Sequence, residues 1–143
     1  MNTARERIEF YSTRGDYGCF SNFYRAVVRV GGKDWATTEH YFQAQKFAGT
    51  EHEGRVRQAK TPGDAASLGR RRDIPLRRDW ENVKENVMLE ALRAKFEQHA
   101  DLAEILLGTG GAELVEHTER DSYWGDGGDC SGRNRLGHLP EQF

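Results

Sequence analysis

Residues 37–48 read TTEHYFQAQKFA, and this stretch decides both the fold and the candidate site of the chain. Thr37 or Thr38 can cap a helix, because a threonine side chain accepts a hydrogen bond from the first helical turn. The residues that follow predict a helix over 39–48, which ends near Gly49. The other elements are expected on either side of this helix.

The sequence on both sides predicts a mainly α (α+β) fold, a helical domain with a small N-terminal β-hairpin or sheet. A strand is expected over residues 8–11, and two short runs joined by Gly31-Gly32 predict a β-hairpin over 27–35. Further helices are expected over residues 51–59, 61–69, 80–99 and 101–107, and residues 113–117 fit either a strand or a helical turn. The length of 143 residues suits one domain over residues 1–143.

The composition is that of a polar protein without a dedicated duplex-binding or membrane-spanning part. Charged residues make up 31% of the chain and the net charge is −2, whereas duplex-binding domains usually carry a basic excess. The first seven residues are polar, so no signal peptide is expected, and no apolar run approaches the ~20 residues that cross a bilayer. Cys19 and Cys130 are far apart and in no metal-ligand spacing, which favours two reduced thiols in a cytoplasmic protein without a metal or other cofactor.

The first helix places several reactive groups on one face. At 3.6 residues per turn, Glu39, Gln43 and Lys46 share this face, with Phe42 beside them. A carboxylate, an amide, an amine and an aromatic ring therefore form one stripe. On helix physics alone a simpler interpretation is favoured, in which Glu39 and Lys46 only complement the helix dipole by about 0.3–1 kcal/mol each.

The longest expected helix carries a second stripe, made of Trp80, Lys84, Met88, Ala91 and Lys95. Two lysines on a face with Trp and Met are unusual for a purely apolar surface. Either the lysines extend from the edge of the core to water, or they face a phosphate, and the sequence favours neither interpretation.

A glycine-rich segment near the end of the chain, residues 120–137, has the composition of a functional loop. Tyr123 and Trp124 offer a surface on which a heterocyclic base can stack. Asp121 and Asp126 offer carboxylates. A calcium site is disfavoured because the ligand order of an EF-hand is absent.

Five arginines lie in a basic segment between residues 70 and 78. Such a segment can bind a substrate phosphate. More often it is a solvated surface segment whose arginines pair with nearby acids, and this second interpretation is favoured here.

The sequence lacks the signature motifs of serine hydrolases, P-loop enzymes, zinc proteases and dinucleotide dehydrogenases. Six other motifs follow one another along it, namely FSNF at 20–23, TEHYFQAQKF at 38–47, Trp80 and Met88 with AKF at 94–96, LVE at 114–116, DSYWG at 121–125 and GRNRLG at 132–137. In this order they resemble the YbiA-like NADAR family, the riboflavin-intermediate N-glycosidases. Family members usually continue past the position of Gly137 into a further helix, whereas this sequence ends at Phe143.

The resemblance implies a YbiA-like helical domain and an N-glycosidase activity. The implied reaction is hydrolysis of the ribosyl C–N bond of early riboflavin-pathway intermediates, the 5-amino-6-ribosylamino pyrimidine 5′-phosphates, to ribose 5-phosphate and a pyrimidine. Two alternatives are removal of ADP-ribose from guanine in single-stranded DNA and a non-catalytic module that binds ADP-ribose or a nucleotide. In the DNA-directed branch a lysine is thought to form a Schiff base with the opened ribose, and Lys46, Lys84 and Lys95 are the candidates here.

Cleavage of a ribosyl C–N bond needs a carboxylate and a proton for the departing nitrogen. We expect Glu39 to be the acid/base and Asp121 or Asp126 to be the second carboxylate. The helix N-terminus lowers the pKa of Glu39, while burial beside Phe42 and Trp124 raises it, and burial must dominate if Glu39 donates a proton. No metal is expected in this site.

The remaining site residues are expected to bind the substrate, with the oligomeric state left open. Trp80 and Trp124 would hold the pyrimidine between them. One of the three lysines, together with Arg70, would hold the phosphate. Asn134 would hydrogen-bond the base or the ribose. The full set expected to contact the substrate is Asn22, Gln43, Trp80, Lys84, Lys95, Tyr123, Trp124 and Asn134.

Overall fold

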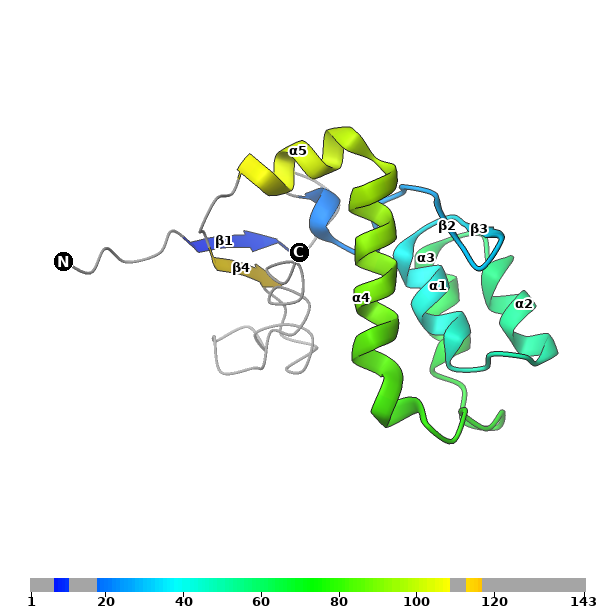
Figure 1. The fold of residues 1–143 in the computed structure, drawn as a ribbon. Coiled ribbons are helices and arrows are strands. Elements are labelled where there is room, and N and C mark those ends of the chain that lie inside the picture. Colours follow the sequence, from blue (N-terminus) through cyan, green and yellow to red (C-terminus); the bar gives the residue numbers. More distant parts are fainter. Residues whose placement is uncertain (1–6, 11–17, 109–112, 117–143) are drawn as a thin grey trace. The chain divides into compact units, whose positions relative to one another are not determined.

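The computed structural model describes the backbone of residues 7–10, 18–108 and 113–116 and the side chains of residues 19–108 (Figure 1). Along the chain the elements are β1 (Arg7–Phe10), the 3-10 helix η1 (Gly18–Phe20), β2 (Val28–Val30), β3 (Lys33–Trp35), α1 (Thr38–Gln45), α2 (Glu51–Arg57), α3 (Pro62–Gly69), α4 (Trp80–Gln98), α5 (Ala100–Gly108) and β4 (Glu113–Glu116). The expected mainly α fold with a small β component is confirmed.

The chain divides into two compact units, one formed by residues 22–98 and the other by residues 1–21 together with 99–143. In the second unit β1 pairs with β4 in parallel, with Arg7 opposite Glu113 and Phe10 opposite Glu116. This pairing explains why residues 113–116 form a strand, which the local sequence left open: the partner strand is more than a hundred residues away. One domain over residues 1–143 therefore stays a prediction.

The unit of residues 22–98 begins with the expected hairpin. Strands β2 and β3 pair antiparallel, with Val28 opposite Trp35 and Val30 opposite Lys33. Gly31 and Gly32 form the turn with φ values of 63° and 78°. A two-residue turn with positive φ at both positions matches the right-handed twist of the strands, and glycine adopts this conformation without steric cost.

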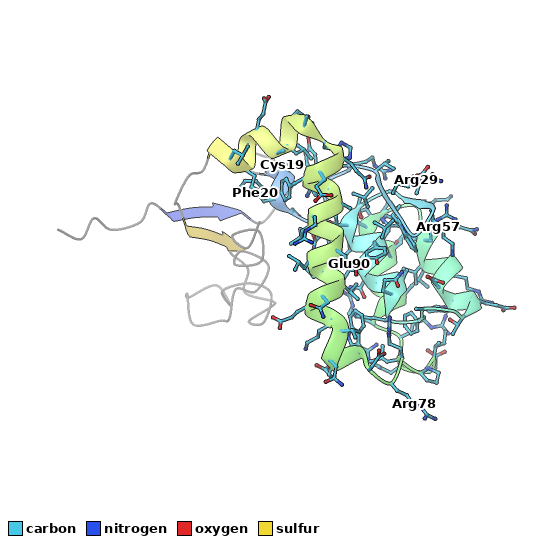
Figure 2. The ribbon with its side chains drawn as sticks, in the orientation of Figure 1. Cys19, Phe20, Arg29, Arg57, Arg78 and Glu90 are labelled. Carbon is cyan, nitrogen blue, oxygen red and sulfur yellow. The ribbon has the colours of Figure 1, made fainter. Side chains whose placement is uncertain are left out.

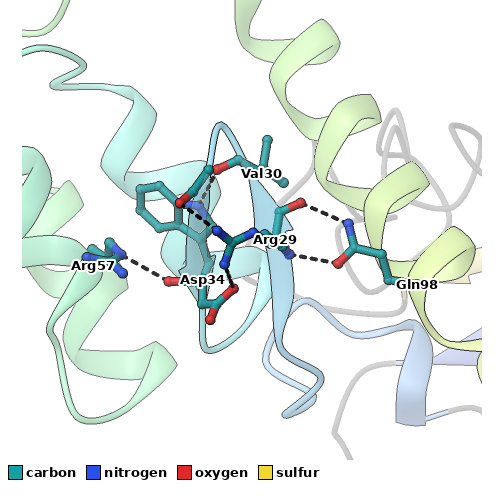
Figure 3. A network of polar contacts seen from close by, with 7 residues as sticks. Arg29, Val30, Asp34, Arg57 and Gln98 are labelled. Atoms are coloured by element: carbon teal, nitrogen blue, oxygen red, sulfur yellow. Dashed lines mark hydrogen bonds and ion pairs between the residues drawn. The ribbon is translucent and has the colours of Figure 1, made fainter.

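The end of α4 is attached to this hairpin by one side chain (Figure 3). The Gln98 amide accepts a hydrogen bond from the Arg29 backbone N–H at 2.7 Å and donates one to the Arg29 carbonyl at 2.8 Å. The amide thereby pairs with β2 as a neighbouring strand would. On the other side of the hairpin, the Arg57 guanidinium of α2 donates to the Asp34 carbonyl at 2.9 Å.

Helix α1 lies among α2, α3 and α4 and also contacts β3 (Figure 1). Seven consecutive residues, 38–44, are buried, so every face of this part of the helix is covered. Thr37 is the N-cap, and its Oγ1 accepts a hydrogen bond from the His40 backbone N–H at 3.2 Å. The sequence had indicated one interacting face, whereas the structure buries the helix on all sides.

We predict that Gln98→Ala lowers the free energy of unfolding by about 1–2 kcal/mol, because two hydrogen bonds to the Arg29 backbone are lost. The matched control is Glu97→Ala, an exposed neighbour on the same helix that should change stability by less than about 0.5 kcal/mol. Urea denaturation followed by circular dichroism measures both variants. Equal stabilities of the two variants would contradict the role given to Gln98.

Candidate active site

Two polar side chains of α1 form a buried pair one helical turn apart. Glu39 is 8% exposed and Gln43 is 7% exposed. The Gln43 Nε2 donates a hydrogen bond of 2.7 Å to the Glu39 Oε1. A buried carboxylate is costly unless it is hydrogen-bonded, and this amide supplies part of the required compensation.

Lys46, the residue directly after α1, places its amine close to this pair. Its side chain is 8% exposed, and its Nζ lies 5.8 Å from the centroid of the Phe42 ring and 5.9 Å from that of the Trp80 ring. The two rings meet edge-on with centroids 5.1 Å apart. The Nζ also makes a long hydrogen bond of 3.5 Å to the Gly69 carbonyl. The amine is thus held between aromatic rings and a backbone oxygen.

The pKa of Lys46 is lowered from its ordinary value to about 8. Burial is the largest cause, because it disfavours the charged ammonium. The positive charges of Arg72 and Arg70 lower the pKa further, while the Glu39 carboxylate raises it. With a pKa of about 8, about a tenth of the amine is neutral at pH 7, compared with roughly one part in three thousand for an ordinary lysine.

Asn22 fixes the first turn of α1. Its backbone carbonyl accepts a hydrogen bond of 3.2 Å from the Glu39 N–H, and its Oδ1 accepts one of 2.7 Å from the Thr38 hydroxyl. Its Nδ2 contacts the Met88 sulfur at 3.3 Å. The Asn22 amide therefore links α1 to α4, and its expected contact with the substrate stays a prediction.

His40 is fully buried on the same helix and was not predicted from the sequence. Its Nε2 lies 2.9 Å from the Ala59 carbonyl and its Nδ1 lies 2.8 Å from the Thr37 hydroxyl. Burial lowers its pKa. A neutral ring that donates from Nε2 and accepts at Nδ1 satisfies both contacts, so His40 ties α1 to the segment before α3.

The other two candidate lysines, Lys84 and Lys95, both lie on α4. Lys84 forms an ion pair of 2.6 Å with Glu81. Lys95 is fully buried, with its Nζ 5.7 Å from the Tyr24 and Phe96 ring centroids. Because Lys95 is fully buried, it does not extend to water. It follows Trp80 by fifteen positions, or about 22 Å along a helix, so its backbone is far from the ring that the Lys46 amine contacts.

The basic segment before α4 is divided between paired and site-facing arginines. Arg71 pairs with Asp73, and Arg77 pairs with Asp79 at 2.6 Å, as the surface interpretation predicts. Figure 2 shows Arg78 extending away from the helices. Arg72, in contrast, donates to the Gly69 carbonyl at 3.0 Å, which is the same oxygen that Lys46 contacts.

Several predicted site residues lie outside the described part of the chain, namely Asp121, Tyr123, Trp124, Asp126 and Asn134. Of the remaining predicted residues, the structure brings together Glu39, Gln43, Lys46 and Trp80. Reasoning from the sequence missed Arg72 and Gly69 as neighbours of this group. Helix periodicity predicted that Glu39, Gln43 and Lys46 share one face. Contacts between different helices leave no comparable signal in the local sequence.

These observations define a small, mainly helical domain with a buried carboxylate, an amine of lowered pKa and aromatic rings gathered around one helix. The NADAR domain family matches residues 9–142. The N-glycosidase YbiA of Escherichia coli (strain K12) is 58% identical over 132 residues, covering 92% of this chain and 82% of that protein. Its NMR structure has a TM-score of 0.89 at 55% identity, covering 98% of this chain and 84% of that one.

The chain therefore belongs to the NADAR domain family. The N-glycosidase Npun_R5314 of Nostoc punctiforme is 47% identical, covering 91% of this chain and 85% of that protein. The riboflavin biosynthesis protein VVA0006 of Vibrio vulnificus is 40% identical, covering 96% of this chain but 38% of that protein. The names of the closer relatives bear out the expected enzyme class, hydrolases that act on N-glycosyl bonds. Among the described residues, no helix is long and apolar enough to cross a membrane.

We predict that Arg72→Gln raises the pKa of Lys46 from about 8 toward its ordinary value, because a nearby positive charge is removed. The matched control is Arg71→Gln. The Arg71 guanidinium pairs with Asp73, so its loss should leave the Lys46 pKa unchanged. Heteronuclear NMR of the lysine side chains across pH 6–11 measures both. Equal shifts in the two variants would contradict the specific effect of Arg72.

Proposed function

We propose that this chain hydrolyses the ribosyl C–N bond of 5-amino-6-ribosylamino pyrimidine 5′-phosphates and releases ribose 5-phosphate and a pyrimidine. One observation carries the proposal: the buried Glu39–Gln43 pair lies beside a lysine whose pKa is about 8. The names of the Escherichia coli and Nostoc relatives support the bond that is cleaved. The name of the Vibrio relative supports the riboflavin-related substrate. The cytoplasmic location expected from the sequence is part of this proposal.

Hydrolysis adds one water across the C–N bond. The ribose carbon gains the hydroxyl group, and the departing pyrimidine nitrogen gains the proton. Positive charge develops on the ribose carbon as the glycosylamine opens to a protonated imine, before a nucleophile adds, so a carboxylate nearby stabilises the transition state. Glu39 supplies this carboxylate, and the Gln43 amide keeps it in place. Asp121 or Asp126 is the proposed second carboxylate.

The Lys46 amine is suited to covalent chemistry at the same carbon. A glycosylamine opens to an imine, and the neutral amine of Lys46 attacks the imine carbon. The pyrimidine amine then leaves with a proton, and a lysine imine remains. Water hydrolyses this imine, which releases the ribose phosphate and restores the amine. A pKa of about 8 favours this role because a useful fraction of the amine is neutral near pH 7.

The arginines beside Lys46 are better suited than the lysine to hold the phosphate. Arg70 and Arg72 are exposed and are close enough for their charges to lower the pKa of Lys46. A guanidinium stays charged at any physiological pH and matches the geometry of phosphate oxygens. We therefore assign the phosphate to the two arginines and the covalent step to the lysine. The Trp80 ring, with Trp124 as the proposed second wall, would contact the pyrimidine.

We predict that the purified protein releases ribose 5-phosphate from the ribosylamino pyrimidine phosphate and that Glu39→Gln lowers kcat at least about 100-fold, because the acid/base is removed. The matched control is Glu51→Gln, which alters an exposed acid in the first turn of α2 and should leave kcat unchanged. Chromatography of the products measures turnover. A parallel incubation with ADP-ribosylated single-stranded DNA tests the alternative substrate. Turnover of that DNA alone would overturn the proposed substrate, and wild-type turnover by Glu39→Gln would overturn the role of Glu39.

We also predict that Lys46→Arg abolishes turnover although the positive charge is kept, because a guanidinium does not form the imine. In the wild-type protein, kcat/KM should rise through pH 6–8 and level off above the Lys46 pKa of about 8, as the neutral amine accumulates in the free enzyme. Cyanoborohydride added during turnover should attach the ribose phosphate to Lys46, detected by mass spectrometry. An active Lys46→Arg variant, or trapping on Lys84 instead, would contradict the covalent role.

A further inference from the structure

Gly69, the last residue of α3, lies against the side chain of Gln43 on α1. A Cβ atom built at Gly69 would lie 2.0 Å from the Gln43 Oε1, 2.7 Å from its Cδ and 2.9 Å from its Cβ. Real Cβ atoms essentially never approach other atoms this closely. Two of these three atoms belong to the amide end of the Gln43 side chain, but the third is its Cβ, which cannot swing away. Only a hydrogen atom fits between the two residues.

The backbone conformation does not explain a glycine at this position. The described glycines with positive φ are Gly31, Gly32 and Gly49, and Gly69 is not among them. Gly69 lies within α3, where an alanine would be more favourable than a glycine by about 0.5–1 kcal/mol. The absence of a side chain therefore serves the contact with Gln43 and not the path of the chain.

The Gln43 side-chain amide is only partly hydrogen-bonded in its observed position. Its Oε1 is buried and has no hydrogen-bond partner among the described residues. Its Nε2 donates to Glu39. Because one half of the amide is unsatisfied, the observed orientation depends on the Glu39 hydrogen bond and on the space beside Gly69. If that space were filled, the amide would have to leave Glu39.

We infer that Gly69 is a positioning residue for the Glu39 carboxylate, acting through the Gln43 amide. This inference rests on the role of Glu39 in the proposed function. The Gly69 carbonyl also accepts hydrogen bonds from Arg72 and Lys46. One glycine thus orients the carboxylate through its α-carbon and contacts the two cations through its oxygen.

The test is Gly69→Ala, with Gly63→Ala on the same helix as the matched control. A Cβ at Gly63 would meet no atom nearer than the Thr61 hydroxyl at 3.8 Å. We expect Gly69→Ala to lower kcat about 100-fold, because displacement of a catalytic group by about 1 Å has this effect. KM should change less than kcat. Gly63→Ala should keep both wild-type values.

The pH dependence separates positioning from a general loss of structure. The Gln43 N–H stabilises the ionised form of Glu39, so its displacement should raise the pKa of that carboxyl relative to the wild type. The ¹³C NMR titration of Glu39 without substrate should therefore move to higher pH in Gly69→Ala. An unchanged kcat with an unchanged titration would overturn the inference.

A double variant keeps the test decisive if Gly69→Ala folds poorly. Gln43→Ala removes the side chain with which the new methyl group collides. Gly69→Ala/Gln43→Ala should therefore match Gln43→Ala alone in kcat and have a melting temperature at least as high. A double variant that is unfolded, or whose losses multiply, would overturn the inference. If the wild-type protein does not cleave the pyrimidine substrate, the proposed function fails, whereas the NMR titration still tests the contact between Gly69 and Gln43.

Discussion

The rest of the structure depends on one constraint: α1 is covered on all sides although four of its seven buried residues are polar. Buried polar groups destabilise a protein unless they are hydrogen-bonded, so each must find a partner inside the fold. His40 meets the Thr37 hydroxyl and the Ala59 carbonyl. Glu39 meets Gln43 through its carboxylate and Asn22 through its backbone. These contacts leave α1 little freedom to rotate or slide.

This rigidity has a direct chemical consequence. A catalytic group contributes most when it is already oriented before the substrate arrives, because no reorganisation is then needed. Glu39 lies in the first turn of α1 and Lys46 directly follows its last residue, so α1 fixes the backbone positions of both residues. The rings of Phe42 and Trp80 exclude water from the amine and thereby lower its pKa. Burial of Glu39 and Lys46 costs stability, and the same burial lowers the pKa of the Lys46 amine.

Local signals in the sequence were sufficient for most elements of the fold. The Thr37 cap, the Gly31-Gly32 turn and the Pro62 start of α3 each act within a few residues, and the structure has all three. Strand β4 depends on a partner over a hundred residues away and was left ambiguous. The stripe of Glu39, Gln43 and Lys46 followed from helix periodicity. Gly69 was interpreted only as the end of a helix, because its contact with Gln43 exists only after α1 and α3 come together.

In the proposed function, the charges around Lys46 connect substrate binding with the covalent step. Arg72 and Arg70 lower the pKa of the amine because they are positive and near. A phosphate bound by these arginines brings negative charge to the same place and offsets part of their effect. The amine is then more basic with substrate bound, and it becomes less basic again when the ribose phosphate leaves. The proposed roles follow from one electrostatic argument. Near pH 7–8 the Lys46 amine can lose its proton, which suits it to the covalent step, whereas the arginines stay charged and suit the phosphate.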